Sequence, residues 1–296
     1  MKLEEKLKVS QMNRLHPAAT VALYSLILAT CVFSNRPEIM ATSLVGALLY
    51  IYWLLGAKSA VEQLKMSLII IFMTALINGL FTHNGATVLF YINTNRVTLE
   101  AICYGLMLGT LLSSVFAWSK AFAVLLSSDK LIYIFSVFGS KASLVVSMIF
   151  RSVPLLQNRY HLARLGQKSL GEGKGWLMQL KDVIKAIDVV IGWSLEAAID
   201  SADSMVSRGY GLKGATTFHL FYWYGKDLIV MASTLILSAT VLCMYWQGYG
   251  QINFYPEINW AKPDPILIGV CVIMFFSPVV IDLFGGIRWN ISKWKI

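Results

Sequence analysis

The stretch AIDSADSMVSRGYG, residues 198–211, places a charged and polar helix end inside a largely apolar chain. Glycine commonly follows the last residue of a helix, because it adopts the left-handed backbone conformation without a steric penalty. Gly209 therefore marks the end of a long helix, with Arg208 at its last turn. A cation there is stabilised by the helix dipole by about 0.3–1 kcal/mol. Arg208 is thus either a simple helix-end cation or a contact for a partner.

The rest of the 296-residue chain is 57% hydrophobic and only 14% charged. This composition predicts an all-α integral membrane protein rather than a soluble domain. The four cysteines are isolated from one another, without the spacing of a disulfide framework or a metal site. Six runs are apolar and long enough to cross about 30 Å of hydrocarbon. They are residues 17–34, 39–57, 64–81, 99–118, 227–246 and 265–284.

The basic residues predict the orientation of these spans. With both termini placed in the cytoplasm, all of the 25 Lys and Arg residues except Arg36, Arg96 and Lys262 fall on the cytoplasmic side. Cytoplasmic segments of membrane proteins carry this excess. The net charge of +9 therefore belongs mainly to one membrane face, and it does not indicate nucleic-acid binding.

The spans divide the chain into three predicted regions: spans one to four in 1–118, a cytoplasmic or interfacial region in 119–226, and spans five and six in 227–296. The middle region contains three helical patterns, around 128–138, 141–168 and from 176 or 182 to 207. Arg151 and Pro154 interrupt the apolar part of the second pattern. A lipid-exposed span rarely carries an arginine, so we expect this helix either to lie at the inner interface or to pack on other helices, with a kink near Pro154.

Other residues within or between the spans are weaker candidates. Gly105 and Gly109 form a small-xxx-small pair that would admit a neighbouring helix, although membrane helices contain many glycines in any case. Asp282, near the inner end of the last span, is interpreted as interfacial rather than as an intramembrane functional group. The segment 82–98 is interpreted as a polar, exposed loop.

Several motifs, taken in order, resemble the T component of energy-coupling factor (ECF) transporters, the EcfT/CbiQ family. Arg14-Leu15-His16-Pro17 resembles the family's Leu-Asp-Pro opening, with His16 in place of the acid. Leu126–Leu131 and Phe150–Leu156 are similar to two further family elements. The most specific match is residues 198–211, which resemble the segment in which an Arg-Gly-Tyr-Gly sequence ends a coupling helix.

In that family two such helix tips dock into grooves on two cytoplasmic ATPases. The resemblance assigns this role to Ser207-Arg208-Gly209, and it tilts Asp203 towards holding the helix pair together. The corresponding first tip reads Ser169-Leu170-Gly171, with Leu170 where the family has arginine. Either that ATPase is contacted by an apolar residue, or Lys168 or Arg164 supplies the charge.

Glu196, Asp200 and Asp203 share one helix face, as either a solvated stripe or an ion-pairing surface. The sequence contains no Gly-x-x-x-x-Gly-Lys-Ser/Thr loop, so ATP and Mg²⁺ would bind to partner subunits. The resemblance implies a non-catalytic scaffold in a prokaryotic plasma membrane. Its partners would be two ATPases and a small membrane subunit that binds a vitamin, another micronutrient or a transition-metal ion. The alternatives are a membrane-embedded lipid-modifying enzyme and a secondary transporter.

Overall fold

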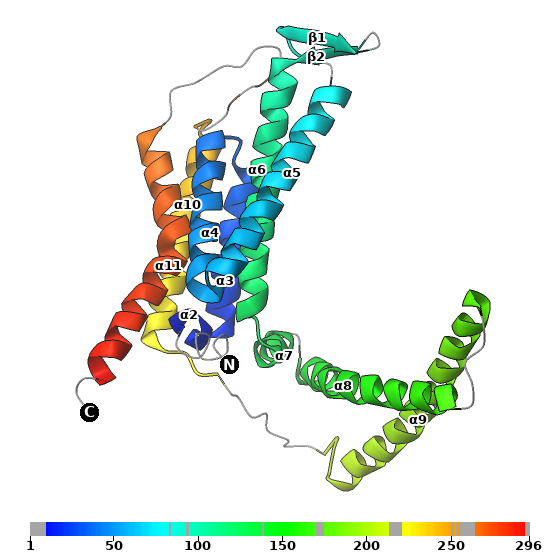
Figure 1. Cartoon of the computed structure of the whole chain (residues 1–296). Helices are drawn as coiled ribbons and strands as arrows, with labels where there is room; N and C mark the ends of the chain where they lie inside the picture. The colour runs from blue at the N-terminus through cyan, green and yellow to red at the C-terminus, as the bar shows by residue number, and fades with distance from the viewer. Residues whose placement is uncertain are drawn as a thin grey trace. The chain divides into compact units, whose positions relative to one another are not determined.

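The structure is a computed structural model that describes residues 10–82, 84–92, 95–137, 139–169, 175–212, 221–249, 252, 254 and 264–293. It is helical apart from one hairpin, which confirms the all-α membrane class (Figure 1). The helices are α2 (Gln11–Arg14), α3 (Pro17–Phe33), α4 (Pro37–Leu55), α5 (Ala57–Phe81), α6 (Leu99–Leu125), α7 (Ser128–Val137), α8 (Ser140–Ser169), α9 (Trp176–Ser207), α10 (Gly225–Trp246) and α11 (Pro265–Lys293).

The chain forms two compact units. Met1–Ser127 and Phe221–Ile296 make up the span unit, and Ser128–Leu220 make up the crossed-helix unit. Among the described residues, five helices are long and apolar enough to span a membrane: α4, α5, α6, α10 and the part of α11 from Pro265 to Phe284. The sixth predicted span, α3, is apolar but shorter, with 17 residues. At 1.5 Å per residue it covers about 26 Å, close to the thickness of the hydrocarbon core.

The core of the span unit surrounds Trp118 of α6. Its indole Nε1 donates a hydrogen bond of 3.0 Å to Ser43 Oγ on α4. The rings of Tyr24 on α3 and Tyr50 on α4 lie against it, with centroid distances of 6.0 and 6.3 Å. Both tyrosines and Trp118 are fully buried. Aromatic side chains bury the most apolar area per residue, so this cluster fixes the packing of three helices.

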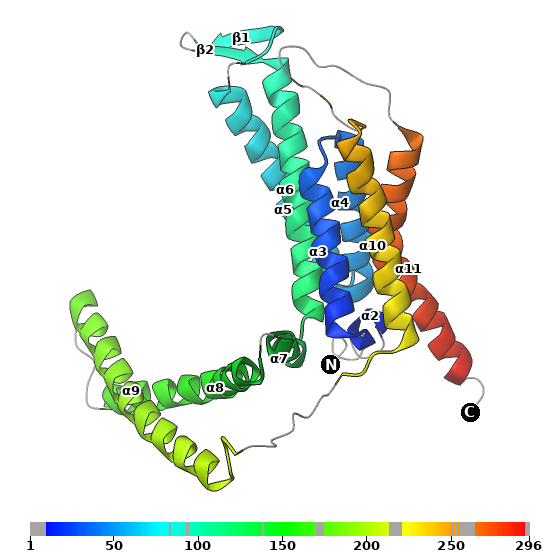
Figure 2. The same cartoon turned by 180° about the vertical axis from the view of Figure 1, so that it is seen from behind.

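Gly105 and Gly109 lie where α6 packs against α5 (Figure 2). A Cβ atom added to Gly105 would stand 2.8 Å from the Ala75 Cα, and one added to Gly109 would stand 2.7 Å from the Ile71 Cα. Real Cβ contacts are never that short, so neither position admits a side chain without moving α5. Small residues at this spacing let two membrane helices approach closely.

The segment expected as a loop at 82–98 contains a hairpin instead. Strand β1 (Val88–Ile92) pairs antiparallel with β2 (Asn95–Thr98), with an irregular register between Val88 and Phe90. The Glu100 carboxylate at the start of α6 holds the base of the hairpin, since it accepts hydrogen bonds from Thr87 N and Oγ1 at 3.1 and 2.6 Å. The hairpin and α2 lie at opposite ends of the span unit (Figures 1 and 2).

Asp282 on α11 is buried inside the folded protein, while its predicted interfacial depth stays a prediction. The carboxylate accepts hydrogen bonds from Ser10 Oγ, from Met12 N and from the Tyr50 hydroxyl. These donors come from the N-terminal segment and from α4, more than 230 residues away along the chain. The carboxylate therefore joins three parts of the span unit.

Candidate functional site

The candidate site is the C-terminal end of α9. Arg208 is the C-cap residue, with φ −85° and ψ 5°, and Gly209 follows with φ +85°. Tyr210 N donates to Met205 O and Gly209 N donates to Val206 O, both at 3.0 Å. These two bonds make a Schellman motif, which ends the helix through its backbone. The ending therefore depends on the glycine conformation, and the Arg208 side chain is not required for it.

Arg208 is exposed, and so is Ser207, whose hydroxyl donates to Ser204 O at 2.9 Å. A guanidinium presents several N–H donors in a rigid plane, which matches a carboxylate on a partner. An exposed arginine at a fixed helix end is accordingly a suitable docking group for an acidic groove.

The first predicted tip is described only in part. Ser169 is the last residue of α8, exposed, with its hydroxyl donating to Leu165 O at 3.1 Å. Leu170 and Gly171 lie outside the residues that the structure describes. The two predicted tips, with Leu170 and Arg208, can therefore be compared by their sequences only.

Arg151 and Pro154 both lie on α8, and both are exposed. The helix is continuous through Pro154, while the predicted kink stays a prediction. Asp203 is exposed on α9 and forms no hydrogen bond or ion pair with the described residues. Its predicted part in holding the helix pair thus depends on the family resemblance alone.

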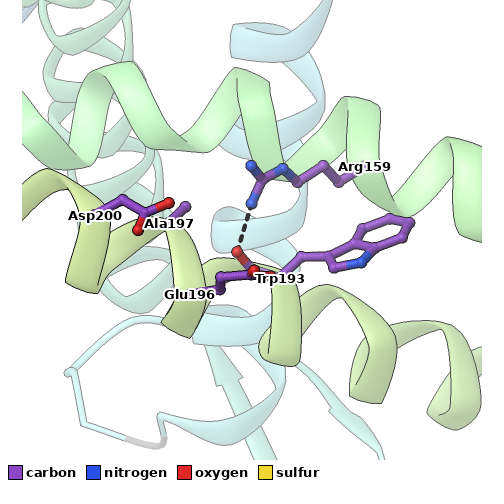
Figure 3. A pocket seen from close by; sticks show the side chains of 5 residues that line it. All are labelled: Arg159, Trp193, Glu196, Ala197 and Asp200. Atoms are coloured by element: carbon purple, nitrogen blue, oxygen red, sulfur yellow. Dashed lines mark hydrogen bonds between the residues drawn. The ribbon is translucent and has the colours of Figure 1, made fainter.

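A hydrogen bond between α8 and α9 comes from a residue that the sequence did not single out. Arg159 of α8 donates a hydrogen bond of 2.8 Å from Nη1 to the carbonyl oxygen of Trp193 on α9 (Figure 3). A backbone carbonyl has two lone pairs, so Trp193 can accept this bond as well as one within its helix. Glu196, Ala197 and Asp200 line the pocket beside Arg159. Two of the three predicted acids thus lie at the helix crossing.

No local signal distinguished Arg159 from its neighbours, because Arg164 and Lys168 follow it on the same amphipathic segment. The face of α8 that meets α9 emerges only from the crossing itself. His161 also lies on α8, but it is exposed. Among the described residues, no group of three or more His, Cys, Asp or Glu could hold a metal ion.

A second surface of α9 is an apolar stripe. Its members are large aliphatic residues spaced three, four or seven residues apart, which places them on one face of the helix. Ala186 and Val190, the buried residues of α9, lie on the opposite face. All of the stripe is exposed: Leu177, Leu180, Ile184, Ile187, Ile191, Leu195, Ile199 and Val206. Exposed apolar surface on this scale marks a site of contact with lipid or protein.

Comparison with known proteins gives one partial match. A stretch of 113 residues, 37% of this chain, is 32% identical to the "Energy-coupling factor transporter transmembrane protein EcfT" of Lactobacillus helveticus (strain DPC 4571). The match covers 41% of that relative's length. No family model matches the chain. The chain is therefore a multi-pass membrane protein with partial similarity to an EcfT protein.

Proposed function

We propose that this protein is the membrane-embedded energy-coupling scaffold of an ECF-type importer. In this role it joins two cytoplasmic ATPase subunits to a small membrane subunit that binds the transported vitamin, micronutrient or metal ion. The main support for the proposal is that Arg208 is exposed at the end of α9, while backbone hydrogen bonds alone terminate that helix. The partial match to an EcfT protein supports the same role.

The proposed work is transmission of motion. ATP and Mg²⁺ bind to the partner ATPases, and closure of those subunits moves the tips seated in their grooves. Arg208 reaches a carboxylate in one groove, where exclusion of water strengthens the ion pair. The Arg159 contact keeps α8 and α9 crossed, so that displacement of one tip is passed to the other helix. The chain itself then needs no catalytic residue.

The apolar stripe of α9 fits a location at the inner face of a prokaryotic plasma membrane. A soluble scaffold would bury eight aliphatic side chains, whereas a helix at the interface presents them to lipid or to the substrate-binding subunit. The thirteen Lys and Arg residues from Lys120 to Lys226 are expected on the cytoplasmic side, together with both termini.

Purification from the native membrane in a mild detergent tests the proposal. We expect two P-loop ATPases to be recovered with the wild-type chain, together with a small membrane protein, and to be identified by mass spectrometry. Lys181→Glu reverses a charge at another exposed site of α9. It should retain these partners and serves as the control for Arg208→Glu. Recovery of a lone chain that transports or catalyses by itself would overturn the proposal.

A further inference from the structure

The N-terminal collar is the segment Ser10–His16 of the span unit. Both ends of the collar contact other elements of that unit. At the first end, the buried Asp282 carboxylate of α11 accepts hydrogen bonds of 2.9 and 3.0 Å from Ser10 Oγ and of 2.9 Å from Met12 N. Tyr50 of α4 donates to the same carboxylate at 3.1 Å. A buried carboxylate is costly unless several donors satisfy it, so these bonds hold α2 firmly against α4 and α11.

At the second end, His16 performs two tasks with one ring. Its Nδ1 accepts a hydrogen bond of 3.3 Å from Ala18 N and so caps the start of α3. The same ring stacks on Trp223, with a centroid distance of 3.8 Å and an interplanar angle of 22°. An accepting Nδ1 carries no proton, and the imidazole is nearly fully buried.

Trp223 occupies a special place in the chain. Phe221 is the first residue of the span unit after the crossed-helix unit, and α10 begins at Gly225. The Asp227 carboxylate caps that helix by accepting from Tyr224 N at 3.0 Å. The stack on His16 is therefore made inside the four-residue re-entry segment Phe221–Tyr224, directly before a capped span.

We infer that the collar couples this re-entry segment to α3 and α11, with His16 and Asp282 as positioning residues. Motion that reaches Phe221–Tyr224 from the crossed-helix unit is then passed to α3 and α11 at their collar ends, in addition to the direct packing of α10 on both helices. The inference depends on the proposed coupling function for its consequence, but the contacts that carry it lie wholly within the span unit.

The first experiment measures the collar in the full chain without any partner. His16→Asn keeps an N-cap side chain and removes the stacked ring, and Trp223→Leu removes the ring's partner. We expect both variants to increase amide hydrogen exchange in peptides covering 221–230, and the double variant to add little to either. His161→Asn, the same change at an exposed site, is the control. Unchanged exchange in both stack variants would overturn the inference.

The Asp282 end of the collar needs a milder change as well. Asp282→Asn replaces an acceptor by an amide N–H₂ that faces donors, so the variant is expected to be poorly folded. Tyr50→Phe removes one donor and leaves the carboxylate in place. We expect Tyr50→Phe to increase exchange in peptides covering 10–16, and Ser10→Ala, which removes a donor of the collar itself, to increase it further. A flat response to both variants would show that Asp282 does not hold the collar.

The third measurement separates positioning from simple structural support. In the assembled transporter, His16→Asn and Trp223→Leu should lower substrate uptake per ATP hydrolysed by about fivefold or more, a typical coupling factor. Trp223→Phe, which retains a stacking ring, should restore the ratio. A fall in uptake and ATP hydrolysis in equal proportion would overturn the positioning role. Absence of any ATPase from the wild-type complex would instead overturn the proposed function, and leave the exchange result standing.

Discussion

The C-terminal ends of α9 and α10 have the same backbone and different side chains. In α10, Gln247 is the C-cap with φ −75° and ψ 0°, and Gly248 has φ +86°. Gly248 N donates to Tyr245 O and Tyr249 N donates to Met244 O, both at 3.0 Å, which repeats the pattern at Gly209 and Tyr210. The motif thus forms equally well after glutamine and after arginine. The Arg208 side chain is therefore not needed to end α9 and can serve another purpose.

Charge reversal at the C-terminal ends of α9 and α10 should give the largest difference in ATPase binding between them. We expect Arg208→Glu to weaken ATPase binding by about 2–5 kcal/mol, because it places two carboxylates against each other in the groove. Gln247→Glu is the matched change and should leave binding unaltered. The measurement is the amount of ATPase recovered per membrane chain. If Arg208→Glu retains its partners, Arg208 is only a helix-end cation.

Alanine at the two glycines tests whether the ends are structurally equivalent. An L-residue in the left-handed conformation costs about 1–2 kcal/mol, so Gly209→Ala and Gly248→Ala should loosen their last turns to a similar degree. Amide exchange of Tyr210 and Tyr249 reports this. Only Gly209→Ala should also reduce ATPase recovery, because it moves Arg208. Unequal exchange at the two sites would contradict the equivalence.

Arginine at the first tip extends the comparison to the two predicted docking ends. Leu170→Arg should leave ATPase recovery equal or increased, since it supplies the charge that Arg208 has. Raising the salt from about 0.15 M to about 1 M shortens the Debye length from roughly 8 to 3 Å. The wild-type complex should then lose one ATPase contact before the other, and the variant should lose both together. Strong loss of assembly in Leu170→Arg would show an apolar groove there.

The smallest expected effect is the pH dependence of stability that His16 causes at the start of α3. Burial lowers the pKa of His16 below its usual 6.5, and the nearby Asp227 carboxylate opposes the shift. The unfolded chain therefore binds the proton more readily, so the contribution of His16 to stability is complete above pH 6.5 and is lost as the pH falls through the lower folded value.

The thermal midpoint of the purified protein should consequently fall between about pH 7.5 and about pH 5.5. His16→Asn, whose cap does not titrate in this range, should show a smaller fall. An equal fall in both proteins would mean that other groups dominate the acid response. Arg208→Gln should not alter the midpoint difference, because the end of α9 does not depend on its side-chain charge.

The sequence predicted the spans well because each is decided by local composition. The expected runs 39–57 and 227–246 differ by two residues or fewer from α4 and α10 at each end. In contrast, α5 begins seven residues before the expected run 64–81, and α6 ends seven residues after the expected run 99–118. The glycine stop after α9 was equally local, since Gly209 supplies a conformation that other residues avoid. Fold class and helix ends therefore followed from short stretches.

Contacts between distant segments were not predictable in the same way. The burial of the Asp282 carboxylate was not predicted because its donors, Ser10 and Tyr50, lie far away in the chain. The β1–β2 hairpin was missed because its apolar first strand and polar second strand show no shared alternation. The Arg159 bond to Trp193 required the crossing of α8 and α9, which neither helix specifies alone.

Under the proposed function, that crossing decides how far each end of α9 moves. At 1.5 Å per residue, Trp193 lies about 22 Å from Arg208 and about 26 Å from Trp176. The bond to Arg159 is therefore placed near the middle of α9, where it can act as a pivot. A rotation of about 10° around it would move both ends by roughly 4 Å in opposite directions. Under the proposed function, a displacement of one end of α9 therefore produces an opposite displacement of similar size at the other end.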